Sequence, residues 1–217
     1  MISDNLHRIL NSLPASVKLI AVTKKRSLRE IEELYRNGYN VFGENRVQDL
    51  VERYSTLPKD IEWHLIGHLQ TNKVKNIAPF VSLIHSVDSL KLLQIINKEA
   101  QKCNRIIPCL LQFYIADEET KFGLSVEEAE KLLSSETFSE MKNIQIVGVM
   151  GMASNTDNQT QIKEEFVALA SIFNSLKSNH FQDKSFFKEI SMGMSSDYLL
   201  AVEQGSTMVR VGSALFE

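Results

Sequence analysis

Eight short apolar runs with strand character recur along the chain and are separated by segments of helical periodicity. This alternation is expected of βαβ units around a parallel sheet, and several runs are apolar without interruption, as in strands covered on both faces. Eight such units can close into a (β/α)8 barrel or remain an open doubly wound sheet, and the alternation alone favours the barrel only slightly. We predict strands at residues 18–22, 40–43, 63–67, 83–87, 106–114, 144–150, 186–192 and 207–211.

The segments between these runs carry helix signals. Residues 28–37 place Ile31, Leu34 and Tyr35 on one helical face, and Gly38 then provides a C-terminal stop. Ser125 followed by Glu128 is a capping-box pattern, and Asp88 precedes a helix expected over residues 90–100. We find no linker and no repeat beyond the βα alternation, so residues 1–217 are expected to form one domain, an α/β protein with a single barrel.

Composition and charge exclude several classes of protein. The net charge is −3 and both signs are spread along the chain, unlike the basic stripe of a nucleic-acid binder. The chain starts without a signal-peptide pattern and has no run long enough to cross a membrane, so we expect a cytosolic protein that binds neither nucleic acid nor membranes. Two cysteines, Cys103 and Cys109, do not make a disulfide framework, and we interpret both as reduced thiols.

Lys24 is the first candidate for chemistry because it follows the first predicted strand directly. In a parallel barrel, active sites are built at the C-terminal ends of the strands. An amine attacks an aldehyde only when it is unprotonated, and partial burial or neighbouring cations, here Lys25 and Arg26, would lower its pKa. The alternative is that Lys24, Lys25 and Arg26 form a solvated turn, which is the commoner role of such a triplet.

Small residues follow each of the last two predicted strands, in SMGMSSD and VRVGS. These loops are the usual phosphate site of a barrel. Gly193 would let the backbone approach an anion, Ser195 and Ser213 offer hydroxyl donors, and a helix beginning near Ser195 would direct its amides at the phosphate. Alternatively, Gly193 and Ser195 only turn the chain and cap that helix.

Arg210 lies inside the apolar run MVRVG and therefore needs an acceptor, because a buried unpaired charge is costly. Strand alternation places it on the same face as Gly212. It could hydrogen-bond to a ring nitrogen of a ligand or form a structural ion pair with an acidic neighbour, and the sequence leaves both open.

Other polar residues belong to the rim of the same barrel but do not define a metal site or a hydrolase. FGEN, which ends at Asn45, and IGHLQTNK at 66–73 follow the second and third strands. His64 and His68 have the spacing of zinc-binding helices, but the residues between them read as strand and turn. GMSSD has Asp197 where a nucleophile elbow requires glycine.

Taken in order, AVTK, FGEN, WHLIGHLQTNK, ETKFGL, SMGMSSDYLLAVEQGST and VRVGSALF closely resemble the pyridoxal-phosphate homeostasis proteins, the YggS/PROSC family. The resemblance covers nearly the whole chain and implies a barrel like the N-terminal domain of alanine racemase. His68 falls within the variation of the family, whereas the terminal Glu217 departs from its usual final Phe-Gly and puts only the last contacts in question.

The resemblance also implies roles for six residues around pyridoxal 5′-phosphate (PLP). Lys24 would form a Schiff base with the cofactor, Ser195 and the Gly212-Ser213 segment would bind its phosphate, Arg210 would lie by the pyridine nitrogen, and Asn45 would line the pocket. An arginine at that nitrogen disfavours ring protonation and so weakens the electron sink that many PLP-dependent reactions need.

We therefore expect a PLP-binding homeostasis protein that buffers the cofactor or delivers it to apoenzymes, acts as a monomer and has no dedicated catalytic activity. Alanine racemase has a further β-domain with a catalytic tyrosine; no residue follows Glu217 here, so efficient two-base racemisation is not expected. One alternative is a PLP enzyme of low activity that uses Tyr198 or Tyr114 as the opposing acid or base. Another is a barrel that binds a phosphate ligand without PLP.

Overall fold

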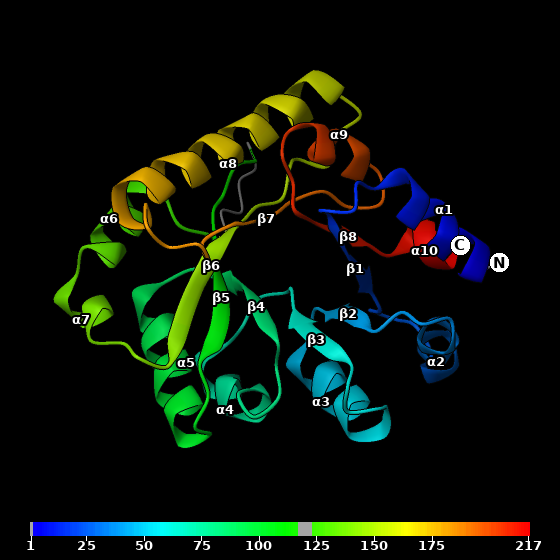
Figure 1. Ribbon diagram of the computed structural model, residues 1–217, viewed down its shortest axis with the longest axis horizontal. Coiled ribbons are helices and arrows are strands. Elements are labelled where there is room, and N and C mark those ends of the chain that lie inside the picture. The colour runs from blue at the N-terminus through cyan, green and yellow to red at the C-terminus, as the bar shows by residue number, and fades with distance from the viewer. Residues whose placement is uncertain (1, 117–122) are drawn as a thin grey trace.

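The eight predicted strands are present and close into a parallel barrel in chain order (Figure 1). The structure is a computed structural model that describes residues 2–116 and 123–217. Because the sheet is closed, the fold is a barrel and not an open doubly wound sheet. The strands are β1 (Lys18–Val22), β2 (Val41–Glu44), β3 (Glu62–Leu65), β4 (Leu83–Val87), β5 (Ile107–Gln112), β6 (Ile144–Met150), β7 (Glu189–Ser191) and β8 (Met208–Val211).

The seventh strand is shorter than the predicted run 186–192 because part of that run packs as an aromatic cluster. Phe187 is fully buried and its ring stacks on Phe181 and Phe173, with centroid separations of 4.2 and 4.9 Å. The apolar character of residues 186–187 therefore serves packing outside the strand, and β7 begins only at Glu189.

Helices follow the strands and form the outer layer. The predicted capping box of Ser125 and Glu128 is confirmed, and Gly38 adopts a φ of 82° after the second helix. Asp88 was expected to start the fifth helix, but the side chain of Ser89 accepts the Leu92 amide and is the N-cap. The helices are α1 (Ile2–Ser12), α2 (Leu28–Arg36), α3 (Val47–Thr56), η1 (Thr71–Lys73), α4 (Val74–Ile77), α5 (Leu90–Lys102), α6 (Val126–Leu133), α7 (Glu136–Ser139), α8 (Gln159–His180), α9 (Tyr198–Glu203) and α10 (Ser213–Phe216).

Buried apolar residues form two separate clusters. The larger one lies between strands and helices, whereas the smaller one consists of residues from alternate strand positions inside the barrel, such as Ile20, Leu110 and Met208. The barrel interior also holds buried polar side chains, among them His85 and Arg210. The interior is therefore a mixed core, and its polar part lies beneath the candidate site.

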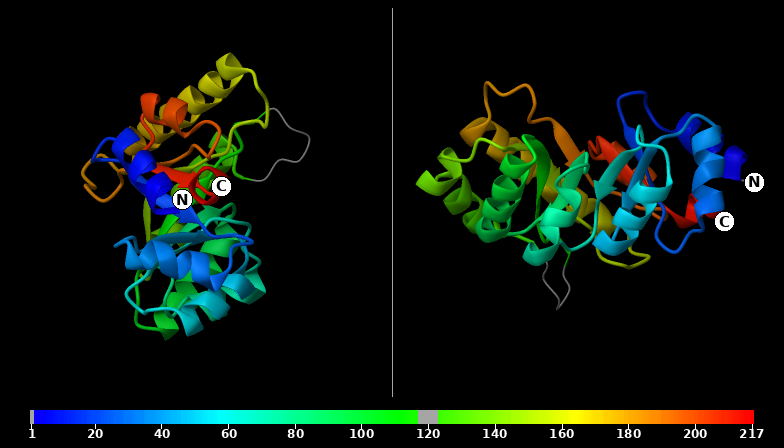
Figure 2. Two further views of the ribbon diagram at one scale, coloured as in Figure 1. Left: turned by 90° about the vertical axis from the view of Figure 1, so that its right-hand side faces the viewer. Right: turned by 90° about the horizontal axis from the view of Figure 1, so that it is seen from below.

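The first and last helices lie side by side where β8 pairs with β1 to close the barrel (Figures 1 and 2). Asn5 donates a hydrogen bond to the Leu215 carbonyl at 3.2 Å, and Arg8 donates to the Ala214 carbonyl at 3.3 Å. These contacts fasten α1 to α10 and so support the loop that follows β8.

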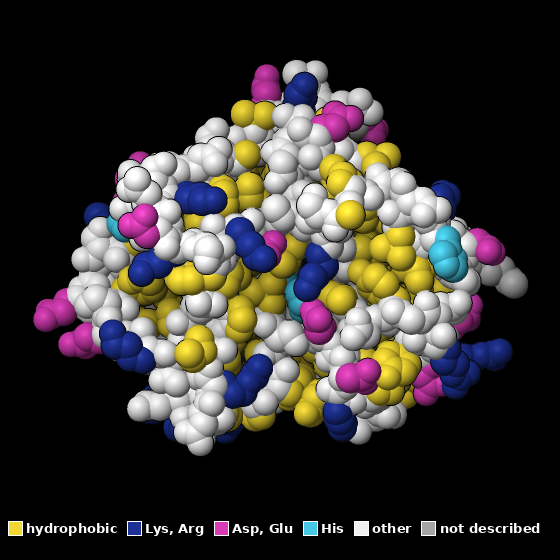
Figure 3. Space-filling model, viewed as in Figure 1, with side chains coloured by type: hydrophobic (Ala, Val, Ile, Leu, Met, Phe, Trp, Pro, Cys, Tyr) yellow, Lys and Arg dark blue, Asp and Glu magenta, His cyan; other side chains and the backbone are white. Residues whose placement is uncertain are grey.

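The face of the molecule drawn in Figure 3 carries charges of both signs without segregation. On the face drawn in Figure 3, basic and acidic side chains alternate with apolar patches and uncharged groups. Among the helices that the structure describes, none combines the length and apolarity needed to cross a membrane.

Candidate functional site

All six residues predicted from the sequence line one cavity at the C-terminal end of the barrel. The cavity has a volume of about 550 Å³, and loops that follow β1, β2, β3, β6, β7 and β8 contribute to its wall. The structure therefore brings the two ends of the chain together at one site. The predicted residues in its wall are Lys24, Asn45, Ser195, Arg210, Gly212 and Ser213.

Lys24 occupies a tight turn directly after β1. The Arg26 amide donates to the Thr23 carbonyl at 3.0 Å and closes this turn, and Lys25 has a φ of 62°, which is unusual for a residue other than glycine. Lys24 is exposed, and Lys25 and Arg26 are its neighbouring cations in the turn. The Lys24 amine is thus accessible from the cavity and from solvent.

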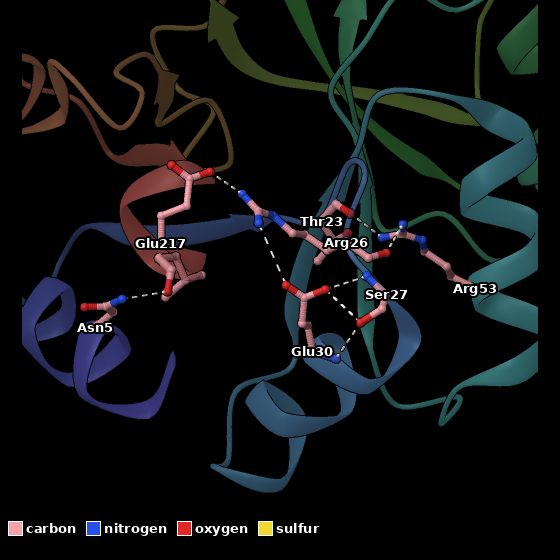
Figure 4. Close-up of polar contacts among 8 residues, drawn as sticks. Asn5, Thr23, Arg26, Ser27, Glu30, Arg53 and Glu217 are labelled. Atoms are coloured by element: carbon pink, nitrogen blue, oxygen red, sulfur yellow. Dashed lines mark hydrogen bonds and ion pairs between the residues drawn. The ribbon is translucent and has the colours of Figure 1, made fainter. Parts of the chain in front are cut away.

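Arg53 on α3 holds both sides of the Lys24 turn (Figure 4). It donates to the Thr23 carbonyl at 2.6 Å and to the Arg26 carbonyl at 2.9 Å, and it also forms an ion pair with the buried carboxylate of Glu44. The Thr23 hydroxyl donates to the same carboxylate. Burial raises the pKa of Glu44, while Thr23 and Arg53 counteract that rise. The strained turn is therefore fixed by a buried ionic network.

The sequence prediction missed this network. Glu44 belongs to the FGEN motif, but only Asn45 was given a role, and Arg53 looks like an ordinary polar position of an amphipathic helix. One signal could have indicated the pair: Glu44 ends a strand whose four residues are all buried, and a buried carboxylate needs a cation.

Arg26 is engaged by two carboxylates, which Figure 4 shows, and by an aromatic ring. Its guanidinium lies 2.7 Å from Oε1 of Glu217 and 3.8 Å from Oε1 of Glu30, and it lies over the Phe216 ring at 5.0 Å. Glu217 also lines the cavity. Glu217, which stands where the family usually ends in Phe-Gly, thus links the end of α10 to the turn that carries Lys24.

The loops after β7 and β8 meet through Ser195. Its hydroxyl oxygen accepts the Gly212 amide at 3.1 Å and the Ala214 amide at 3.3 Å, at the start of α10. The helix expected near Ser195 is present but begins three residues later: α9 starts at Tyr198, after a turn in which Asp197 accepts the Met194 amide at 2.5 Å. Ser195 is therefore held against the segment after β8 by two backbone amides.

Gly193 has a structural role in this loop. Its φ is 95°, and a Cβ atom there would lie 2.6 Å from the Cβ of Ala201 and 3.0 Å from the Cα of Tyr198. Glycine is therefore required for the turn and for the close approach of α9, as the alternative interpretation of this residue proposed.

Arg210 lies under the cavity and is 4% exposed. Its guanidinium donates to the Ser191 carbonyl at 2.8 Å, to the Ser191 hydroxyl at 2.7 Å and to the Gly151 carbonyl at 3.0 Å. Burial lowers its pKa to about 10, with Asp197 opposing the shift, so the group is cationic at neutral pH. Within the described part of the chain no carboxylate forms an ion pair with Arg210, which leaves the cation available to a ligand.

Other predicted rim residues lie around this site. Asn45 is exposed and also borders a neighbouring cavity of about 450 Å³ that includes His68, Gln70 and Lys73, so FGEN and IGHLQTNK do share one rim. His64 is instead buried inside the barrel, and His68 lies 3.5 Å from Asp88. Residues 119–122 of the ETKFGL motif lie outside the described residues.

Two methionines and an isoleucine complete the apolar wall of the cavity, and the sequence analysis gave them no role. They are Ile66 after β3, Met152 after β6 and Met194 after β7. Their position after strand ends was the available signal. By contrast, neither Tyr198 nor Tyr114 is among the described residues of the cavity wall, and the Tyr198 hydroxyl lies 3.2 Å from that of Ser12 on α1.

The whole chain, residues 1–217, matches the family model described as alanine racemase, N-terminal domain. This match defines the class of barrel. A pyridoxal phosphate homeostasis protein of Aquifex aeolicus is 36% identical over 92% of this chain and 86% of its own length, and one of Synechocystis is 35% identical over 96% and 94%. The chain belongs to the family of pyridoxal phosphate homeostasis proteins, within the alanine racemase N-terminal domain class.

Solved structures agree with this assignment. PipY of Synechococcus elongatus without PLP superposes with a TM-score of 0.93 at 33% identity over 100% of both chains. The PLP-bound structure of PipY gives a TM-score of 0.88 at 33% identity over 100% of both chains. Alanine racemase of Bartonella henselae gives 0.75 at 17% identity over 99% of this chain and 57% of its own, a likeness that shows the fold alone.

The ionic network predicts a large effect of Arg53→Met on stability. Removing the guanidinium leaves the Glu44 carboxylate buried without its cation, so the free energy of unfolding should fall by about 3–5 kcal/mol at neutral pH. The control is Arg36→Met, which removes an exposed pair with Glu32 on α2 and should cost no more than about 0.5 kcal/mol. Urea unfolding followed by circular dichroism measures both values.

The same network predicts how the loss of stability in Arg53→Met changes with pH. Without Arg53 the pKa of Glu44 in the folded state rises further above its unfolded value, so the folded protein takes up a proton as the pH falls. The deficit of Arg53→Met should therefore shrink towards acidic pH, and Glu44→Gln in the same background should recover part of it at neutral pH. Equal unfolding curves for Arg53→Met and Arg36→Met would contradict the network.

Proposed function

We propose that this chain binds PLP, holds it as a Schiff base on Lys24 and serves PLP homeostasis. The observation that carries the proposal is one cavity with an accessible amine after β1, hydroxyl and amide donors after β7 and β8, and a buried cation on β8. The names of the relatives, and the PLP-bound structure of PipY, support the same cofactor.

The residues present fit the parts of this cofactor. The Ser195 hydroxyl, whose oxygen accepts the Gly212 and Ala214 amides, would donate its proton to the phosphate, and the Gly212-Ser213 segment with its exposed Ser213 would bind it from the other loop. Arg210 would face the ring nitrogen, and Asn45 would line the pocket. The cavity of about 550 Å³ is of the usual size for a small-molecule site. When bound, the cofactor supplies an aldehyde for the amine and a ring that can act as an electron sink.

The surroundings favour holding the cofactor over reacting with amino acids. A cationic Arg210 would donate to the ring nitrogen and so oppose ring protonation, which would weaken the electron sink. Tyr198 and Tyr114, the candidates for an opposing acid or base, do not belong to the described cavity wall. We therefore propose buffering of PLP, or its delivery to apoenzymes in the cytosol, by a monomer whose one domain spans residues 1–217.

The Schiff base itself predicts a label on a single lysine. Borohydride reduction of the PLP complex, followed by peptide mass analysis, should place the pyridoxyl group on Lys24, and Lys24→Ala should lose the visible absorption of the imine. Lys25→Ala is the matched control, because it removes the neighbouring amine in the same turn and should keep both signals. Persistence of the absorption in Lys24→Ala would assign the imine to another lysine, and no visible band in the wild type would favour a phosphate ligand without PLP.

The phosphate contacts predict a selective effect of Ser195→Ala. The variant removes a hydroxyl that touches the phosphate in the proposed pose, so PLP affinity should fall roughly tenfold, whereas pyridoxal, which lacks the phosphate, should bind with unchanged affinity. Ser196→Ala changes the exposed neighbouring serine and serves as the control. Absorbance titrations with both aldehydes measure the four affinities. An equal loss for PLP and pyridoxal would place the phosphate elsewhere.

The absence of dedicated catalysis is tested with a panel of amino acids. The PLP complex should show no robust racemisation, decarboxylation or transamination by chiral chromatography and product assays, because Arg210 weakens the electron sink. Robust turnover of any amino acid would support the low-activity enzyme instead. In that case Tyr198→Phe should abolish the activity if the Tyr198 hydroxyl is the opposing acid or base, and Tyr114→Phe should abolish it if the Tyr114 hydroxyl has that role.

A further inference from the structure

Four buried polar side chains form a hydrogen-bonded row across the barrel interior. Nη1 of Arg210 on β8 lies 2.7 Å from the Ser191 hydroxyl on β7, which lies 2.9 Å from Nδ1 of His85 on β4. Nε2 of His85 lies 2.9 Å from Nδ1 of His64 on β3. All four residues are at most 4% exposed. The row begins below the candidate cofactor site and ends at the opposite mouth of the barrel.

The opposite mouth contains a second cavity, of about 400 Å³, to which His64, Lys18 and Glu62 contribute. Nε2 of His64 lies 4.0 Å from Oε2 of Glu62, and the same carboxylate oxygen lies 3.2 Å from Nζ of Lys18. The far end of the row is therefore bordered by a carboxylate that favours an N–H at Nε2 of His64.

The contacts fix the direction in which hydrogen bonds run along the row. A guanidinium only donates, so the Ser191 oxygen accepts from Arg210 and its single proton is free to be donated to Nδ1 of His85. His85 then carries its proton on Nε2 and donates to His64, whose own proton lies on the nitrogen next to Glu62. The reverse direction would leave the Ser191 proton without an acceptor, because its hydroxyl has only these two partners among the described residues.

Both histidines stay neutral at physiological pH. Burial, together with Lys18, lowers the pKa of His64 to about 3. Burial, His64 and Arg210 lower the pKa of His85 well below its usual value. Each ring therefore has one donor and one acceptor nitrogen, as a one-directional row requires.

We propose that His85, supported by His64, is a positioning residue for Arg210 and acts through the Ser191 hydroxyl. By holding the Ser191 proton, His85 directs the oxygen lone pairs at the guanidinium. The Ser191 hydroxyl, the Ser191 carbonyl and the Gly151 carbonyl are three acceptors that fix the plane of the guanidinium beneath the cavity. The inference rests on the proposed function, in which Arg210 faces the ring nitrogen of PLP, and it extends the site to His64 and His85, which are not among the described residues of the cavity wall.

The first test uses the protein without cofactor. Nitrogen-15 NMR of histidine-labelled protein should show His85 and His64 as neutral tautomers with the proton on Nε2. Ser191→Ala should change the His85 signals, because it removes the donor to Nδ1. Either histidine with its proton on Nδ1, or a charged imidazole at neutral pH, would overturn the proposal.

The second test measures the cofactor site. Ser191→Ala and His85→Phe should each weaken PLP binding roughly tenfold, and each should shift the pH profile of the visible band, because Arg210 loses an oriented acceptor. The double variant should bind PLP no more weakly than either single variant, because each single substitution already breaks the row. His180→Phe removes a histidine that is bonded to Glu130 on the outer layer and should behave as wild type.

The outcomes separate this inference from the proposed function. If the wild type and His180→Phe bind PLP on Lys24 while folded Ser191→Ala and His85→Phe keep wild-type affinity and pH profile, only the positioning role is overturned. If the wild type binds no PLP, both proposals fall. Should His85→Phe fail to fold, Ser191→Ala decides alone, because it deletes one hydroxyl and keeps both imidazoles.

Discussion

The pairing of β8 with β1 is the interaction on which the site depends. Their register joins Ile20 to Arg210 and Ala21 to Val211, so the closing ladder places the Lys24 turn beside the loop after β8. Ser195 then bridges the loops after β7 and β8 through two amides. Without this closure, the Lys24 amine and the hydroxyls of Ser195 and Ser213 would lie at opposite edges of an open sheet.

Closure also creates a polar interior that must satisfy its own hydrogen bonds. A buried guanidinium and a buried carboxylate each cost free energy unless neighbouring groups compensate. Arg210 is compensated by Ser191 and a backbone carbonyl, whereas Glu44 is compensated by Arg53 and Thr23. The first network fixes the Arg210 guanidinium beneath the cavity. The second fixes the turn that carries Lys24, through the bonds of Arg53 to the backbone.

The sequence predicts the eight strands because residues covered on both faces must be apolar, and it predicts the location of the site because parallel strands share one C-terminal edge. Prediction failed where an apolar residue serves another purpose, as Phe187 does in its aromatic stack. It also failed where a side chain depends on a distant partner. Neither the bond from Arg53 to the Lys24 turn nor the one from His85 to Ser191 has a signal in local spacing.

The exposure of Lys24 and the burial of Arg210 suit a reversible tether. Under the proposed function, an exposed amine on a turn held by Arg53 would be open to free aldehyde in solution, and a fixed cation below the ring would orient the cofactor without promoting carbanion chemistry. Rigid support of the turn limits the entropy lost when the imine forms. Under the proposed function, the same features that make the site a poor catalyst therefore make it a suitable store for PLP.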